Sequence, residues 1–291
     1  MKKIGVGLFL VLLIGGWFGY KALSKNTTEP EITNVQAVKE KVPTQTKTAI
    51  PTIFFHGYSG GPSSFGGMIA RFEKADIAEQ VLQLRVSPSG KITEKGTWTG
   101  EKENPLIQVL FEDNKNNEWQ QTEWIKSCLT YLSTTYGIAK VNLVGHSMGG
   151  VSSLRYLELG ETADLPEVQK FVAIGAPFND FLDTSTSQSI EDLMENGPSE
   201  ISVRYQDYQG MIQQLPTTID FLVMGGQLSE EELTDGTVPL TSALAISGLV
   251  TAHGNNVQTE IVTGNNVQHS QLHENKQVDQ LIEKFLWAES K

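Results

Sequence analysis

A serine lies between two glycines in the segment Gly145-His146-Ser147-Met148-Gly149. An apolar run at residues 141–144 precedes this segment, and a helical pattern at residues 149–159 follows it. A strand that turns this sharply into a helix needs small residues two positions before and after the serine, and it lifts the serine oxygen above the end of the strand. We therefore predict that Ser147 is the nucleophile of an acyl transfer. The backbone N–H of Met148 would then point toward the oxygen that becomes negative.

The same five-residue pattern occurs a second time, in Gly57-Tyr58-Ser59-Gly60-Gly61. Pro62 follows at once and no long helix is expected after it, so this segment is not predicted to be a second nucleophile turn. In folds that use such a strand–serine–helix turn, the loop after the third strand supplies the second N–H group that binds the negative oxygen. We assign that role to the backbone N–H of Tyr58, with Gly57 as the alternative. His56 precedes the nucleophile, which does not fit the chain order serine, acid, histidine. We expect it to orient the loop.

An attacking serine needs a base, and the base needs a carboxylate that orients it. Asp235 lies in a polar turn about ten residues beyond the apolar run 221–224, where the third member of such a group belongs. Two histidines, His269 and His273, follow the last predicted strand and precede the last predicted helix. His269 lies on the loop and is free to reach Ser147, whereas His273 lies at or inside the start of the helix. We predict His269 as the base and keep His273 as the alternative.

Metal-binding patterns are weak in this chain. His273-Glu274 has no second histidine at helical spacing, so the pair of histidines used by zinc proteases is missing. Residues 113–118 resemble a calcium loop, but Lys115 occupies a position that should offer a ligand oxygen, and the glycine is missing. We expect no metal and no cofactor.

Short apolar runs rich in β-branched and aromatic residues alternate with helical patterns from residue 50 onward. This alternation predicts an α/β fold with a mostly parallel, doubly wound sheet of the α/β-hydrolase type, whose site lies at the carboxyl ends of the strands. The segment between Pro177 and Pro216 contains no clear strand, and we expect a cap or lid at about 177–217, or else a surface excursion. Strands are predicted at 52–55, 81–86, 106–111, 141–144, 170–174, 221–224 and 260–262, and helices at 118–136, 149–159 and 276–287.

The first residues resemble an export signal, because Lys2 and Lys3 precede an uncharged apolar run at 4–20. No small-x-small cleavage site is evident, which favours a retained membrane anchor over a cleaved signal peptide. The predicted organisation is therefore a signal or anchor at 1–23, a flexible linker at 24–49 and a hydrolase domain at 50–291. The protein is expected on the extracellular face of the cell membrane, or secreted.

The amino-acid composition argues against one class of partner and against a disulfide. The chain has 34 acidic and 22 basic side chains, a formal net charge of −12, and no basic run, which argues against nucleic acid as a partner. Its one cysteine, Cys128, excludes an intramolecular disulfide and lies in an apolar stripe at helical spacing, which predicts a place in the core.

Several blocks of the sequence together resemble a known family, the predicted cell-surface α/β-hydrolases of low-GC Gram-positive bacteria, whose function is unknown. The resemblance runs from about residue 52 to residue 287 and implies a hydrolytic reaction by a triad of Ser147, Asp235 and His269, with no substrate attached. The chain is also similar, more distantly, to small bacterial lipases, in which the catalytic histidine stands nine residues ahead of an apolar helix position. His269 and Val278 repeat that spacing. The blocks are Phe55-His-Gly-Tyr-Ser-Gly, Asn104-Pro-Leu-Ile-Gln-Val-Leu-Phe-Glu-Asp-Asn114, Val144-Gly-His-Ser-Met-Gly-Gly150, Asp235-Gly-Thr-Val-Pro-Leu-Thr-Ser-Ala243 and His269-Ser-Gln-Leu-His-Glu-Asn275.

These observations predict a serine hydrolase that cleaves carboxylic esters, of the carboxylesterase or lipase kind, acting on a small-molecule or lipid ester. An amidase or peptidase acting on cell-wall or peptide substrates is the alternative enzyme. A surface binding protein that keeps the fold without catalysis is the alternative outside enzymes. An apolar inner face of the lid would favour acyl chains, and a polar one would favour peptides or glycans.

Overall fold

The computed structural model describes residues 46–160 and 165–288, all of which belong to one compact unit. The predicted anchor at 1–23 and most of the predicted linker at 24–49 lie outside the described residues. Within the described ranges, no helix combines the length and apolar character that a membrane crossing requires.

Residues ahead of the predicted domain start at residue 50 also make contacts with the domain. Thr46 N–H donates to the carbonyl of Trp287 at 2.6 Å, and Thr48 N–H donates to the side-chain oxygen of Asn104 at 3.0 Å. These contacts use backbone and polar groups. Because no apolar residue accompanies them, the hydrophobic pattern of the sequence did not reveal them.

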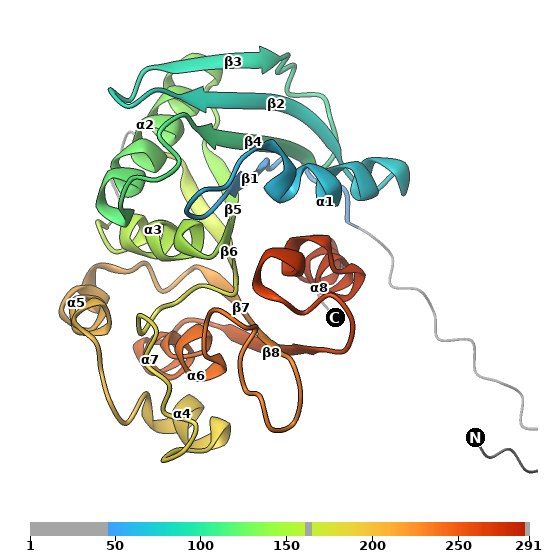
Figure 1. The fold of residues 1–291 in the computed structure, drawn as a ribbon. Coiled ribbons are helices and arrows are strands. Elements are labelled where there is room, and N and C mark those ends of the chain that lie inside the picture. The colour runs from blue at the N-terminus through green and yellow to red at the C-terminus, as the bar shows by residue number, and fades with distance from the viewer. Residues whose placement is uncertain (1–45, 161–164, 289–291) are drawn as a thin grey trace, which may run out of the picture. The chain divides into compact units, whose positions relative to one another are not determined.

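An eight-stranded sheet forms the centre of the molecule (Figure 1), with the strand order β3-β2-β4-β1-β5-β6-β7-β8. All neighbouring strands are parallel except β2 and β3, which are antiparallel. The strands are β1 (Thr52–Phe55), β2 (Glu79–Val86), β3 (Ile92–Gly96), β4 (Pro105–Phe111), β5 (Lys140–His146), β6 (Glu167–Ile174), β7 (Asp220–Gln227) and β8 (Val257–Thr263).

Burial explains which strands were predictable. Every residue of β1 and β4 is buried, as expected of central parallel strands that are covered on both faces. Seven of the eight strands overlap the seven predicted ones, which confirms the α/β prediction. The edge strand β3 was missed because its sequence, Ile-Thr-Glu-Lys-Gly, has one large apolar residue and is mostly exposed.

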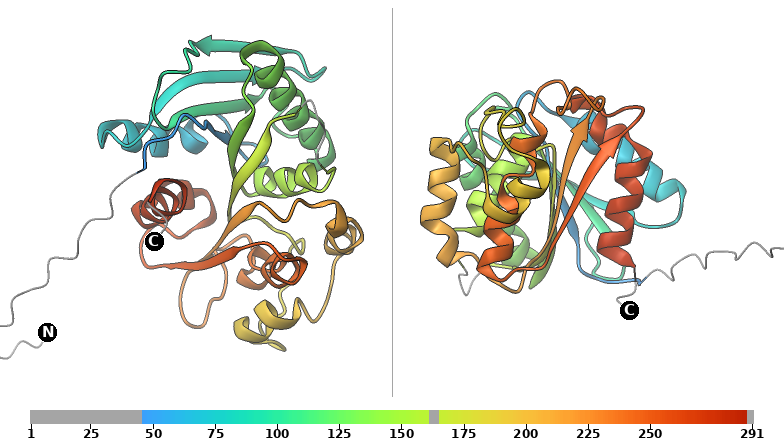
Figure 2. Two further views of the ribbon diagram at one scale, coloured as in Figure 1. Left: turned by 180° about the vertical axis from the view of Figure 1, so that it is seen from behind. Right: turned by 90° about the horizontal axis from the view of Figure 1, so that it is seen from below.

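Helices cover both faces of the sheet (Figures 1 and 2). On one face, α1 (Pro62–Lys74) and α8 (Lys276–Trp287) share a core cluster with side chains of the sheet. The other helices contribute to a larger cluster on the opposite face. These helices are α2 (Glu118–Tyr136), α3 (Met148–Leu157), α4 (Ile190–Asn196), α5 (Val203–Met211), α6 (Leu240–Ala243) and α7 (Ile246–His253). Cys128 in α2 is fully buried, as predicted, and burial raises the pKa of its thiol.

The expectation that no long helix follows Pro62 is wrong, because α1 begins at that residue and runs for 13 residues. Proline suits the first position of a helix, since its fixed φ is helical and its missing N–H would have no partner there. Phe65, Met68, Ile69 and Phe72 of this helix are buried against the sheet at helical spacing.

The segment predicted as a lid contains α4, α5 and a short 3-10 turn at Ile212–Gln214, and no strand, as expected. Its side chains Leu193, Tyr205 and Tyr208 are buried in the same cluster as the sheet. The segment is therefore a packed layer beside the sheet over these residues. Its service as a lid stays a prediction.

Candidate active site

Ser147 lies at the turn between β5 and α3, at the carboxyl edge of the sheet. Its backbone has φ 55° and ψ −128°, a conformation that residues other than glycine rarely adopt and that costs on the order of 1–3 kcal/mol. The turn is closely packed, because a Cβ on Gly149 would overlap the carbonyl oxygen of Phe55 at the end of β1. The tight packing of the turn keeps Ser147 in this strained conformation, with its hydroxyl at the strand end.

The structure brings Ser147, His269 and Asp235 into one hydrogen-bonded chain. His269 Nε2 lies 2.9 Å from Ser147 Oγ, and His269 Nδ1 lies 2.7 Å from Asp235 Oδ2. Because a carboxylate only accepts, Nδ1 carries the proton and Nε2 is free to accept the serine proton. The three residues follow β5, β7 and β8, three strands of the same half of the sheet.

Asp235 is almost completely buried, at 1% exposed. Its second oxygen, Oδ1, accepts hydrogen bonds from the N–H groups of Thr237 and Val238 at 2.9 and 2.7 Å. Since one oxygen is held by the backbone of its own turn, the other is left to face His269. A carboxylate fixed in this way orients the imidazole and keeps one tautomer.

The loop that carries Tyr58 lies beside Ser147 because β1 and β5 are neighbours, with Phe55 opposite Gly145. A Cβ on Gly57 would lie 2.7 Å from the Cβ of Ser147, so only glycine allows this approach. The N–H groups of Tyr58 and Met148 have no hydrogen-bond partner among the residues that the structure describes. Met148 is also the first residue of α3, where the helix dipole favours negative charge.

His56 holds the Tyr58 loop through both of its ring nitrogens. Nδ1 donates to the carbonyl of Gly57 at 2.8 Å, and Nε2 accepts from Phe111 N–H at 3.1 Å. Both ring nitrogens are thus occupied and the ring is neutral, and burial lowers the pKa of His56. This arrangement removes His56 as a candidate base. The carbonyl of Gly57 and the N–H of Tyr58 belong to one peptide, so fixing the first directs the second.

Asn114 holds the same loop from the turn after β4, a contact that the sequence did not reveal. Ser59 N–H donates to the carbonyl of Asn114 at 2.7 Å, and the side-chain amide of Asn114 donates to the carbonyl of Gly60 at 2.7 Å. Asn114 ends one of the sequence blocks on which the predicted family resemblance rests, which was the only available signal for it.

His146, next to the nucleophile, also has a role that the sequence did not show. Its Nε2 donates to the backbone carbonyl of His269 at 2.9 Å, and the two rings lie with centroids 4.7 Å apart. Burial, helped by the rings of His269 and His273, holds the pKa of His146 well below its usual range. A neutral His146 therefore ties His269 to the residue that precedes Ser147.

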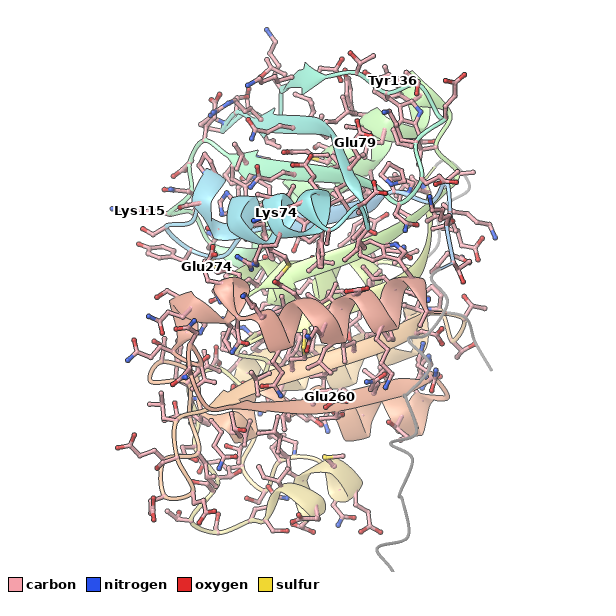
Figure 3. All side chains as sticks on the ribbon, turned by 90° about the vertical axis from the view of Figure 1, so that its right-hand side faces the viewer. Lys74, Glu79, Lys115, Tyr136, Glu260 and Glu274 are labelled. Atoms are coloured by element: carbon pink, nitrogen blue, oxygen red, sulfur yellow. The ribbon has the colours of Figure 1, made fainter. Side chains whose placement is uncertain are left out.

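His273, the alternative base, does not contact Ser147. Its ring packs against His146, with centroids 5.0 Å apart, and burial lowers its pKa. Arg71 of α1 holds this region, donating to the carbonyl of His273 at 2.9 Å and pairing with Glu274 at 2.6 Å. Glu274 and Lys115 lie at the same edge of the molecule (Figure 3).

No group of three or more histidine, cysteine or acidic side chains suited to a metal ion occurs among residues 46–160 and 165–288. The site is thus built from a hydroxyl, an imidazole, a carboxylate and two free backbone N–H groups. This set of groups suits acyl transfer through a covalent intermediate.

Comparison with known proteins shows the family and the fold of this chain. Residues 39–289 match the model of a family described as alpha/beta hydrolase of unknown function (DUF915). The structure of the lin2722 gene product from Listeria innocua is 28% identical in sequence, with a TM-score of 0.74 over 81% of this chain and 93% of that one. A predicted cell surface hydrolase from Lactobacillus plantarum WCFS1 is 22% identical, with a TM-score of 0.67 over 81% and 91% of the two chains. None of the curated proteins compared with the chain matches it.

Proposed function

Because this chain belongs to the family of alpha/beta hydrolases of unknown function, we propose that it is a serine hydrolase that cleaves carboxylic esters. The observation that carries the proposal is the chain of two hydrogen bonds from Ser147 through His269 to Asp235, at 2.9 and 2.7 Å. Hydrogen-bond reach between nucleophile and base, and between base and carboxylate, is the geometric requirement for this chemistry.

The reaction proceeds in two steps. Ser147 Oγ attacks the ester carbonyl carbon while His269 Nε2 takes the hydroxyl proton. His269 then returns that proton to the leaving oxygen, so that the alcohol departs and an acyl-serine remains. Water attacks the acyl carbon as His269 takes a proton from it, and the serine oxygen leaves with that proton while the carboxylic acid is released.

Charge develops on the carbonyl oxygen in both steps. We assign its stabilisation to the free N–H groups of Tyr58 and Met148, which come from neighbouring strand ends. Each preorganised donor of this kind contributes about 10²–10³-fold to kcat. Asp235 keeps the proton on His269 Nδ1 and stabilises the imidazolium that forms when the base accepts the serine proton.

The same proposal places the enzyme on the extracellular face of the membrane, held by residues 1–23 or released from them. Two basic residues ahead of an apolar run support this placement, and one relative of known structure bears the name of a cell surface hydrolase.

The test is to treat the purified full chain with a fluorophosphonate probe and to assay p-nitrophenyl esters and p-nitroanilides of matched acyl length. The proposal expects labelling, rapid ester turnover and slow anilide turnover. Faster anilide turnover would point to the amidase alternative. A folded chain that is neither labelled nor active would contradict the proposal and leave the binding protein.

A further inference from the structure

Large apolar side chains are exposed at one edge of this molecule. Seven are exposed among the described residues, and five of these belong to loops or helix starts at the carboxyl edge of the sheet, where Ser147 lies. We call these five the apolar rim. They are Tyr58, Trp119, Phe181, Ile201 and Val203, and the most exposed are Phe181 at 62% and Val203 at 72%.

Ion pairs beneath the apolar rim hold three of its members together. Arg204, next to Val203, pairs with Glu118, next to Trp119, and with Asp180, next to Phe181. The same guanidinium donates to the carbonyl of Pro177 at 2.9 Å. Arg204 of α5 therefore links the segment that follows β4 with the segment that follows β6.

The remaining members join the patch by hydrogen bonds. Ser202, between Ile201 and Val203, donates its N–H to the side chain of Asn179 at 2.8 Å. Tyr58 joins from the loop that also supplies the proposed oxyanion donor, through Ser59 and Asn114. The apolar rim thus begins at the proposed catalytic groups.

The charges under the apolar rim neutralise one another. Glu118 lies between Arg204 and Arg155, and although burial alone would raise its pKa, its interactions with these two guanidinium groups lower it. The Arg155 guanidinium also lies 3.5 Å from the ring centre of Trp119. The two arginines and Glu118 are therefore paired beneath the apolar rim, while the carboxylates of Asp183 and Glu200 lie exposed beside it and that of Asp180 is partly exposed.

We propose that the apolar rim docks on a lipid surface and that the substrate of Ser147 is an acyl ester presented by that surface, an inference that rests on the proposed hydrolase function. Tyrosine and tryptophan favour the boundary between water and lipid, whereas phenylalanine, isoleucine and valine favour the acyl region. The formal net charge of −12 selects a zwitterionic surface over an anionic one.

The length of the chain before Thr46 allows this docking. Residues 21–45 separate the apolar run from the first described residue. The linker predicted for these residues would have a root-mean-square span of about 25–30 Å and a fully extended length of about 85 Å. A domain with a radius of gyration of about 18 Å is about 45 Å across, so the extended linker is long enough for the carboxyl edge to turn toward a membrane that holds the predicted anchor.

The first test measures docking without catalysis. In the full chain carrying Ser147→Ala, Phe181→Cys is labelled with a polarity-sensitive dye and mixed with phosphatidylcholine vesicles. Met194→Cys is the matched control, because Met194 is an exposed apolar residue of α4 that does not belong to the apolar rim. Cys128 is fully buried and does not compete for the dye. A blue shift at position 181 and none at position 194 is expected, and it should weaken when phosphatidylglycerol is added. No shift at position 181, or equal shifts at both positions, would overturn the proposal.

The second test measures catalysis with Ser147 in place. The double variant Phe181→Glu and Val203→Glu should lose at least 10-fold in rate on a long-chain ester held in vesicles, and less than 2-fold on a dissolved butyrate ester. Met194→Glu should change neither rate. Equal losses on both substrates would contradict docking. If the wild-type chain cleaves no ester but the dye still shifts, the docking surface stands and the proposed function fails. Ester cleavage without a dye shift would overturn the docking surface and leave the proposed function standing.

Discussion

His269 and Asp235 are joined twice. The imidazole Nδ1 of His269 lies 2.7 Å from the Asp235 carboxylate, and the backbone N–H of His269 donates to the backbone carbonyl of Asp235 at 2.9 Å. The proposed base is therefore held by the main chain of the residue whose side chain orients its ring. The backbone bond fixes the position of His269, and the side-chain bond fixes which ring nitrogen carries the proton. A substitution at Asp235 can therefore change the protonation of the ring and leave its position unchanged.

Asp235→Asn should separate these two bonds. The backbone bond remains, and the Asn oxygen can still accept from Thr237 and Val238. The Asn amide then donates to His269 Nδ1 and shifts the proton to Nε2, where it blocks acceptance from Ser147. We expect kcat to fall by about 10³–10⁴-fold, with an unfolding midpoint close to that of the wild type. Steady-state kinetics and thermal unfolding measure the two effects, and retained activity would show that Asp235 is not the orienting carboxylate.

Ser147→Ala and His269→Ala should each lower ester turnover by about 10³-fold or more, because each removes one end of the proton transfer. Ser147→Ala should also abolish labelling by the fluorophosphonate. His273→Ala is the control, since its ring contacts His146 and not Ser147. It should keep activity within about 10-fold. A larger loss in His273→Ala than in His269→Ala would reassign the base.

Gly57→Ala should displace the loop beside Ser147 while leaving Ser147, His269 and Asp235 unsubstituted. The added methyl group would lie 2.7 Å from Ser147 Cβ and displace the loop that carries Tyr58. A fall in kcat of about 10²-fold is expected, the cost of one misplaced oxyanion donor. Gly61→Ala is the matched control, because a Cβ there meets nothing within 4 Å. Similar kinetics for the two variants would exclude Tyr58 as a donor.

Glu158 predicts a dependence of stability on pH. It is 1% exposed, neither carboxyl oxygen has a hydrogen-bond partner among the described residues, and burial raises its pKa to about 9. The folded chain keeps this proton at pH 7 while the unfolded chain has lost it, so the free energy of unfolding should fall as pH rises from about 4.5 toward 9.

Glu158→Gln removes this titration. The variant should unfold at a higher temperature than the wild type at pH 8, and the gap should narrow at pH 5. Exposed Glu123→Gln is the control and should follow the wild type at both values. If the unfolding temperatures of Glu158→Gln and the wild type change equally between pH 5 and pH 8, the Glu158 carboxyl is ionised in the folded chain.

The predictable parts of this protein are those that leave a local pattern. The strand ending at His146 and the helix beginning at Met148 are each visible as an apolar run and a helical repeat, and the glycines between them require a sharp turn. Asp235 and His269 were proposed because each follows a strand within a short polar stretch of sequence, which for His269 is the start of a 3-10 helix at His269–Glu274. The parallel strands β5, β7 and β8 bring the residues that follow them to the same edge of the sheet.

The parts that escaped prediction depend on neighbours distant in sequence. The hydrogen bond from His146 to the carbonyl of His269 joins residues 123 positions apart. The contact between Asn114 and Gly60 depends on β1 lying beside β4. Neither bond requires a particular apolar spacing. Pro62 was misread for a different reason, because proline both ends and begins helices, and only the buried residues that follow it show which applies.

Thr46 N–H donates to the carbonyl of Trp287, so the two ends of the described part lie side by side. In the right-hand view of Figure 2, these blue and red ends lie away from the arrowheads of the sheet, whereas Ser147 follows the carboxyl end of β5. A bead or a fused reporter attached ahead of Thr46 would leave the catalytic edge uncovered. Turnover of the immobilised protein on dissolved substrates should therefore match that of the free protein.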